Sequence, residues 1–296
     1  MPNEPSCLSV VSSGHVERAL AAYLRSRPAG WPEPVAGQNA AAFFAGAFRP
    51  RCPGDGAASL ITGYYEPEIE ARLAPDGVFA HPIHRLPSDP HHDHAAIIAG
   101  ALVGQGLELA WLANPVERFF LQVQGSGRLC LPGGRVMRVG YAGQNGYPYR
   151  SLGQAMVDMG LIAEGDISAD AMRAWFRAHP ARVNEILALN PSWVYFRELP
   201  QLDPGDGPIG TAGVPLAAMI SLAVDPDHIP MGAPVLLETE VNGTPFRSLM
   251  VAQDTGGAIR GAQRADLFFG TGTEAGRLAG RQKAPGRLTV LLPGAD

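Results

Sequence analysis

The spacing of apolar positions predicts two helices near the start of the chain. In HVERALAAYLRS, residues 15–26, an apolar stripe recurs at helical spacing through Val16, Leu20, Tyr23 and Leu24. NAAAFFAGAF, residues 39–48, has the composition of a second, short helix. The first 50 residues are therefore expected to be largely helical.

The middle of the chain alternates between strand and helix patterns. LITGYY, residues 60–65, is typical of a strand that Pro67 closes or leaves at a sheet edge. LELAWLA (107–113) and RFFLQVQGSGRLCL (118–131) carry apolar residues close to alternation, which predicts two strands, the second running into a Gly-Ser-Gly turn.

Further along, RVMRVGYAG (135–143) and NPSWVYFREL (190–199) also have the pattern of strands. Between them, two segments predict helices that begin near Ser151 and Ser168, and Trp175 is expected in the core.

The C-terminal part changes character. AAMISLAVD, APVLLETEV, FRSLMVAQD, DLFFGTG and RLTVLLP are short apolar runs split by Gly, Pro or Asp, a pattern typical of a small all-β barrel. Composition shifts near residue 75 and across the linker LPQLDPGDGPIG, residues 199–210, indicate boundaries. We therefore predict one domain from 1–74 and 199–296, with a module at about 208–293, and a second domain from 75–198.

Composition and charge exclude several classes of protein. Hydrophobic residues make up 46% and charged residues 17% of the 296 positions, which favours a packed core over disorder. The net charge of −5 gives no steering field for nucleic acid. The N-terminal sequence lacks the basic and apolar regions of a secretory signal, and the apolar stretch 95–113 is too polar to span a bilayer. These features leave open a cytoplasmic protein or one whose export segment is absent.

No metal or cofactor site is predicted. Cys7, Cys52 and Cys130 lack metal-type spacing, and we expect no disulfide among them. Histidines cluster in HPIHRLPSDPHHDH, residues 81–94, but this stretch is Pro-rich and irregular. We interpret it as a solvated loop.

Three aspartates end or begin short apolar runs of the C-terminal part. Asp225 and Asp254 each follow an apolar run, whereas Asp266 precedes Leu-Phe-Phe, whose apolarity would raise its pKa by excluding water. Asp before Pro or Gly is also ordinary turn chemistry, which fits Asp225 best and Asp266 least. Asp-Thr-Gly occurs only once, so an aspartic protease would lack half of its site. A glycoside hydrolase with Asp254 and Asp266 as its carboxylate pair stays open.

Six segments together resemble the membrane-bound lytic murein transglycosylase A (MltA) family, in family order from residue 61 onward. The last two resemble its C-terminal 3D module, named for three aspartates. The six segments are ITGYYEPEIEAR, FFLQVQGSGRL, VGYAGQNGYPYRSLG, LALNPSWVYFRE, LAVDPDHIPMGAPV and VAQDTGGAIRGAQRADLFFGTGTEAGRLAG. The resemblance implies a mainly β fold with some helix: a double-psi β-barrel domain and an inserted β-rich domain, with a groove between them for a glycan strand.

The resemblance also implies an activity. Family members cleave the β-1,4 bond between N-acetylmuramic acid and N-acetylglucosamine without water, leaving a 1,6-anhydro end. By position in the motif, Asp266 is the acid and then the base, Asp254 supports it, and Asp225 is structural. This assignment explains a single essential carboxylate, because the sugar supplies its own nucleophile at high effective concentration. A hydrolase of the same bond and a non-catalytic, expansin-like glycan-binding module are the alternatives.

Matching motif positions give the expected substrate-binding residues, which offer amides, hydroxyls and aromatic rings to a sugar. The resemblance further implies peptidoglycan strands as the partner, no cofactor, a monomer with a possible cell-wall enzyme complex, and a periplasmic, outer-membrane-associated location. Cys7 does not follow an apolar region, so it is not assigned as a lipid anchor. The substrate-binding set is Tyr65, Glu66, Gln124, Ser126, Gly127, Tyr141, Asn145 and Tyr149.

Overall fold

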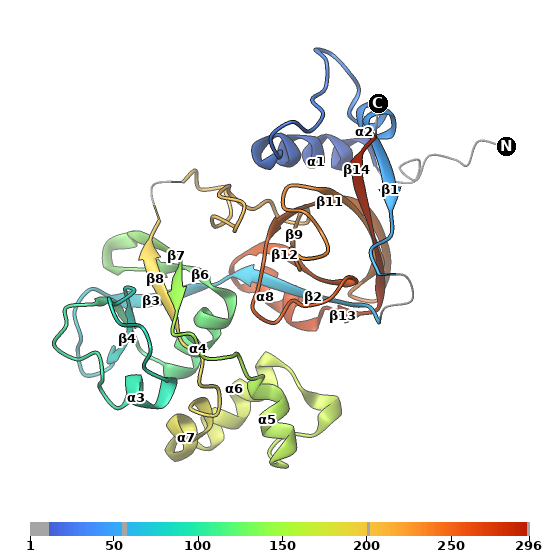
Figure 1. Ribbon diagram of the computed structural model, residues 1–296. Coiled ribbons are helices and arrows are strands. Elements are labelled where there is room, and N and C mark those ends of the chain that lie inside the picture. The colour runs from blue at the N-terminus through green and yellow to red at the C-terminus, as the bar shows by residue number, and fades with distance from the viewer. Residues whose placement is uncertain (1–11, 55–57, 200–201, 295–296) are drawn as a thin grey trace. The chain divides into compact units, whose positions relative to one another are not determined.

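The computed structural model describes residues 12–54, 58–199 and 202–294. The chain forms two compact units, one of Met1–Tyr65 with Pro204–Asp296 and one of Glu66–Asp203. We call them the terminal unit and the inserted unit (Figure 1). The expected boundaries lay at 74/75 and 198/199, so the segment 66–74, assigned by sequence to the first domain, packs with the inserted unit instead.

The terminal unit is built on an eight-stranded sheet in the order β1-β14-β10-β11-β9-β12-β2-β13 within the described residues. Its strands curve around a common interior (Figure 1). Neighbours β11 and β9 run parallel, while β10 pairs antiparallel with β11 and β14. Its elements are α1 (Ser13–Ser26), α2 (Ala40–Ala47), β1 (Phe48–Arg51), β2 (Leu60–Glu66), β9 (Ser221–Val224), β10 (Pro234–Val241), β11 (Thr244–Asp254), β12 (Arg264–Thr271), α8 (Gly272–Arg281), β13 (Lys283–Ala284) and β14 (Gly286–Pro293).

Alternation along β11 gives this sheet two apolar faces. Met250 and Ala252 point into the interior cluster, which also holds Leu267 of β12. Leu249 and Val251 point the other way, against α1 and α2. Of the stripe predicted for α1, Val16 and Tyr23 are buried and Leu20 is half-buried, but Leu24 is 44% exposed because α1 turns Ala19 and Ala22 inward in its place.

The inserted unit contains a six-stranded sheet in the order β4-β5-β3-β6-β7-β8 within the described residues, with β3 and β6 parallel. Its elements are β3 (Glu68–Arg72), β4 (His81–His84), α3 (His94–Ile98), β5 (Glu108–Leu112), α4 (Pro115–Gln124), β6 (Ser126–Cys130), β7 (Val136–Gln144), α5 (Leu152–Asp158), α6 (Ala169–Ala178), α7 (Val183–Leu187) and β8 (Val194–Glu198), with 3₁₀ turns η1 (Pro132–Gly134), η2 (Glu164–Asp166) and η3 (Pro180–Arg182). The predicted helices capped by Ser151 and Ser168 are confirmed, and both side chains accept a backbone N–H.

One predicted strand is wrong. The first half of RFFLQVQGSGRLCL forms helix α4, and only Ser126–Cys130 is a strand. Local signals favour the helix: Asn114 accepts the N–H of Val116 at 2.8 Å, Pro115 occupies the first turn, and Gly125 ends the helix with φ 74°. The apolar residues look like an alternating strand because α4 is buried on two sides, with Leu121 toward the sheet and Phe119 and Phe120 toward the helices.

The histidine-rich segment is not a solvated loop throughout. His84 lies on β4 and His94 opens α3, and their exposed fractions are only 4% and 1%. Both rings pack against Trp193, at centroid distances of 5.9 and 4.9 Å. Trp175, expected in the core, is only half-buried and stacks on His179.

Three further expectations concern thiols, membrane spans and metal sites. Cys52 and Cys130 are free, while Cys7 lies outside the described residues. Within the described ranges, every helix is too short or too polar to cross a bilayer, and no three His, Cys, Asp or Glu side chains are grouped to hold a metal ion.

Gly63 of β2 allows α8 to approach this strand closely. A Cβ there would lie 2.6 Å from a Phe269 ring carbon and 2.9 Å from the Ala279 backbone. Gly63→Ala should therefore lower the free energy of unfolding by roughly 1–3 kcal/mol, because the backbone of α8 has to move. Gly280→Ala on the same helix, where a Cβ meets nothing within 4 Å, is the control and should be neutral or stabilising. Equal stability of the two variants in urea unfolding would contradict this account.

Candidate active site around Asp266

Asp266 is held by two side chains that the sequence analysis did not single out. It lies on β12 opposite Ala223 of β9, and β2 is the neighbour on the other side. The Thr62 hydroxyl of β2 and the Arg264 guanidinium both donate to Asp266 Oδ1. Arg264 also donates to the Thr62 hydroxyl oxygen at 2.9 Å, so the three side chains form a closed triangle.

This triangle fixes one carboxylate oxygen and leaves the other available. Asp266 Oδ2 receives no hydrogen bond from any described residue, and the side chain is 19% exposed. Arg264 is itself fixed through the carbonyl oxygens of Leu60 and Ala265, at 3.3 and 2.7 Å. The carboxylate therefore has a set orientation, with one oxygen able to meet a ligand.

The surroundings of Asp266 differ from those expected. We predicted an apolar setting because Leu-Phe-Phe follows in the sequence. Leu267 and Phe269 point into the sheet interior, away from the side to which Asp266 points, in the usual alternation of a strand. On the Asp266 side lie the hydroxyl of Thr62 and the guanidinium of Arg264, with the buried ring of Phe268 as the one apolar residue of Leu-Phe-Phe on this face.

Tyr64 lies near both Asp254 and Asp266. It lies two residues after Thr62, and its ring packs on Phe268 at a centroid distance of 5.2 Å. Burial raises the pKa of the Tyr64 phenol well above its usual value of 10, and the negative charges of Asp254 and then Asp266 raise it further. The Asp254 carboxylate approaches the buried hydroxyl without completing a hydrogen bond of normal geometry. The phenol is thus a protonated group within reach of both negative charges.

Asp254 ends β11 in a partly desolvated position. Its Oδ1 accepts from the backbone N–H and the hydroxyl of Thr211, at 3.0 and 2.9 Å. Burial nevertheless raises the pKa of Asp254 above its usual 3.8, outweighing the lowering effects of the hydrogen bonds from Thr211 and Thr255 and of the nearby Tyr64 hydroxyl. Asp254 therefore holds a proton more readily than an ordinary carboxyl group.

Asp225 has the geometry of a structural residue. Only 4% of it is exposed, and its oxygens accept the backbone N–H groups of Gly261 at 2.7 Å and Asp227 at 3.3 Å. The hydrogen bond from Gly261 is the main cause that lowers the pKa of this carboxyl. Asp225 thereby anchors the loop that leads into β12 and Asp266.

Two residues expected to bind substrate are completely buried. Glu66 has 0% exposure and pairs with Arg128 at 2.8 Å and Arg138 at 2.9 Å. Asn145, also 0% exposed, donates to the carbonyl oxygens of His92 and Pro191. Neither side chain presents an atom to solvent, so we assign both to positioning rather than to direct contact.

The remaining predicted binding residues differ in how accessible they are. Tyr141 and Tyr149 are 52% and 40% exposed, and their rings are available to a sugar face. Ser126 is buried, and Gln124 is half-buried at the end of α4. Gly127 serves packing, since a Cβ would lie 2.5 Å from Leu121. In the terminal unit, the ring of Tyr65 lies against α8 at Gly276, where a Cβ would be 2.6 Å from a ring carbon.

Comparison with known proteins decides the family. The MltA specific insert domain matches residues 60–197, and the 3D domain matches residues 220–292. The chain belongs to the MltA family. The Thr62 and Tyr64 positions fall in the first matched region, and Asp225, Asp254 and Asp266 fall in the second.

Relatives of known name share most of this chain. Membrane-bound lytic murein transglycosylase A of Vibrio cholerae is 37% identical over 244 residues, which cover 78% of this chain and 65% of that protein. The chain thus spans about two thirds of the length of this curated MltA relative. Among solved structures, MltA from Neisseria gonorrhoeae gives a TM-score of 0.81 at 32% identity, covering 95% of this chain and 89% of the other. Escherichia coli MltA with bound chitohexaose gives 0.78 at 33% identity, covering 96% and 84%.

Proposed function

We propose that this chain is a peptidoglycan lytic transglycosylase. In this reaction the β-1,4 bond between N-acetylmuramic acid and N-acetylglucosamine is broken without water, and the muramic acid ends as its 1,6-anhydro form. Membership of the MltA family supports this class of enzyme, since the relatives are named lytic murein transglycosylases. The chitohexaose bound to the Escherichia coli relative supports a β-1,4-linked amino-sugar polymer as ligand.

The fixed carboxylate of Asp266 is the observation on which the proposal depends. Protonated on Oδ2, Asp266 gives its proton to the glycosidic oxygen as the C1–O4 bond breaks. The muramoyl C6 hydroxyl then forms the bond to C1 and returns its proton to the same carboxylate. The reaction consumes no water, and Asp266 is protonated at its end as at its start.

The neighbours of Asp266 suit these two proton transfers. The Arg264 guanidinium compensates the negative charge that remains on Asp266 after it donates its proton, and Thr62 keeps the carboxylate from rotating. Because the attacking hydroxyl belongs to the substrate, no second carboxylate has to activate water, and holding the ring in position lowers the barrier by roughly 7–11 kcal/mol. Asp254 and Tyr64 then serve in support, as a carboxyl group and a phenol that adjust the field at the reacting sugar.

The remaining parts of the proposal concern the setting. The exposed rings of Tyr141 and Tyr149 are proposed contacts for sugar faces. The names of the relatives associate them with membranes, and we propose a periplasmic enzyme associated with the outer membrane. We propose that it acts on glycan strands as a monomer, alone or within a cell-wall enzyme complex.

The products of digestion test the proposal directly. Purified peptidoglycan digested with the protein should yield muropeptides that are 18 Da lighter than their hydrolysed counterparts, because one water is missing from each anhydro end. Mass spectrometry after complete digestion makes the distinction. Reducing muramic acid ends alone would identify a hydrolase, and no new ends at all, with binding to peptidoglycan retained, would identify a glycan-binding module.

A further inference from the structure

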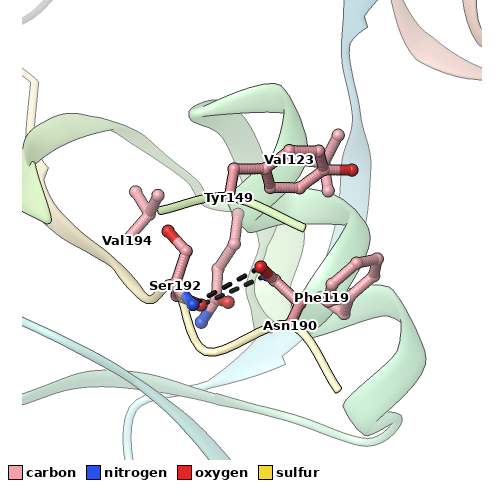
Figure 2. A pocket seen from close by; sticks show the side chains of 7 residues that line it. Phe119, Val123, Tyr149, Asn190, Ser192 and Val194 are labelled. Atoms are coloured by element: carbon pink, nitrogen blue, oxygen red, sulfur yellow. Dashed lines mark hydrogen bonds between the residues drawn. The ribbon is translucent and has the colours of Figure 1, made fainter. Parts of the chain in front are cut away.

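A hollow in the inserted unit, far in sequence from Asp266, has the features of a binding site (Figure 2). Its volume is about 200 Å³ when the space open to solvent at its mouth is included. Phe119 and Val123 of α4 and Val194 of β8 supply apolar walls. The enclosed part is small, so the hollow admits the tip of a ligand and not a whole sugar ring.

Gln122 is the unusual residue of this hollow. It lies on α4, is 6% exposed, and lines the space. Neither Nε2 nor Oε1 of its amide has a hydrogen-bond partner among the described residues. A buried amide without partners costs free energy, so a residue of this kind in an apolar-walled hollow points to a ligand that satisfies both atoms.

The opposite side of the hollow is rigid and polar. Asn190 donates to the carbonyl oxygen of Ser192 at 3.3 Å, and its Oδ1 accepts the backbone N–H of Ser192 at 3.4 Å (Figure 2). The same Oδ1 accepts the backbone N–H of Arg150 at 2.9 Å. These bonds hold the two lining residues Asn190 and Ser192 in place. Because Asn190 is occupied in this way, Gln122 is the lining amide that has no hydrogen-bond partner among the described residues.

We propose that this hollow binds the acetamido group of an N-acetylated amino sugar. The acetyl carbonyl accepts from Gln122 Nε2, and the acetamido N–H or the neighbouring ring hydroxyl donates to Oε1. The acetyl methyl lies against Phe119, Val123 and Val194. The sugar ring stays outside, where the 40% exposed ring of Tyr149 offers a face on which it stacks.

This site rests on the proposed function for its ligand class, since N-acetylmuramic acid and N-acetylglucosamine both carry an acetamido group. It gives the inserted unit a specific task, which is to select N-acetylated over de-N-acetylated strands. The same amide chemistry occurs in the stem peptides of peptidoglycan, so the ligands in the test separate the two sources.

Affinity for defined oligomers is the first test. Titration calorimetry of the full chain compares chitohexaose, the hexamer of glucosamine, and a free stem peptide. We expect Gln122→Leu to raise the Kd for chitohexaose about 5- to 30-fold, the effect of one or two lost hydrogen bonds, and to leave the weak binding of the glucosamine hexamer unchanged. Gln105→Leu, at an exposed position of the same unit, should leave both values unchanged. Unchanged chitohexaose affinity in a folded Gln122→Leu protein would overturn the proposal and leave an ordered water as the occupant.

A second measurement uses the natural chain alone and needs no substituted variant. The side-chain NH₂ signals of Gln122 in a nitrogen-15 spectrum should shift with chitohexaose and stay in place with the glucosamine hexamer. A shift with the stem peptide and not with chitohexaose would also overturn the acetamido assignment. If anhydro products fail to form but these shifts occur, the proposed reaction fails and the site stands. If anhydro products form but these shifts do not occur, the proposed site fails and the proposed reaction stands.

Discussion

Asp266→Asn is expected to reduce the release of anhydro-muropeptides by roughly 10²- to 10⁴-fold, the usual contribution of a positioned acid and base. Asn has nearly the same shape as Asp and retains an oxygen that accepts from Thr62 and Arg264. It cannot donate and recover a proton as a carboxyl group does. The variant should therefore fold, bind peptidoglycan and fail in the chemical step.

The fold of this variant should survive because Arg264 keeps other partners. Its guanidinium still donates to the carbonyl oxygens of Leu60 and Ala265 and to the Thr62 hydroxyl, and it is 16% exposed. Release of anhydro products is followed by mass spectrometry, with thermal unfolding and sedimentation with peptidoglycan measured in parallel. Asp170→Asn, with a side chain 88% exposed on α6, is the matched control and should turn over normally.

A different result would reassign the acid. If Asp266→Asn turns over normally while Asp254→Asn does not, the proton comes from Asp254, whose pKa is raised by burial. Loss of peptidoglycan binding together with turnover in Asp266→Asn would mean that Asp266 holds the ligand and leaves the chemistry to another group.

The sequence predicted most elements with a local signal. The strands around LITGYY and VYFREL and the helices capped by Ser151 and Ser168 carry their own patterns, and each is present in the structure. The mainly β class with some helix is likewise confirmed, because short apolar runs between Gly and Pro leave few other options. Helix α4 was missed because it is buried on two sides. Its apolar residues therefore do not show the spacing of a helix with one buried face, which is the pattern that the sequence analysis looks for.

Local sequence patterns do not predict the side chains that bond to Asp266. Thr62 and Asp266 are 204 positions apart, and only the order of strands in the sheet brings them together. Alternation does contain a partial signal: Thr62 and Tyr64 share one face of β2, as do Asp266 and Phe268 on β12. Reading those alternate positions as one surface would have identified the Thr62 and Tyr64 side chains. Arg264 lies two residues before Asp266, at the spacing expected for a neighbour on the same face.

Acid is expected to destabilise this protein between pH 6.5 and 4, through two histidines of the inserted unit. Burial is the main cause that lowers the pKa of His84 and of His94 from 6.5 to about 4, and the positive charge of Arg118 lowers both further. Glu108 opposes the shift of His84, while the Asn190 carbonyl and Asp93 oppose that of His94. These opposing groups are weaker than burial, so both rings are neutral when the protein is folded at pH 7.

The direction of this pH effect on stability follows from the protons that the folded and unfolded chains bind. Between pH 6.5 and 4 the unfolded chain protonates both imidazoles and the folded chain does not, so falling pH favours unfolding. A shift of 2.5 units corresponds to roughly 3 kcal/mol for each histidine, present in full above pH 6.5 and lost by about pH 4. Protonation of His84 and His94 in the folded protein is unfavourable because the buried Arg118 is already a cation beside them. Its guanidinium lies 4.9 Å from the ring of Trp193, on which both histidines pack.

The slope of stability against pH separates this effect from simple loss of packing. Urea unfolding between pH 7.5 and 4.5 should give a steep fall in unfolding free energy for the natural chain and a much flatter line for His84→Gln/His94→Gln. The double variant is expected to be less stable at pH 7, but a packing defect lowers the whole line without changing its slope. His91→Gln, at an exposed ring in the same segment, should keep the natural slope. If the unfolding free energy of the double variant falls with pH as steeply as that of the natural chain, the effect is due to other histidines. The partly buried His15 and His81 are then the candidates, because burial lowers their pKa values as well.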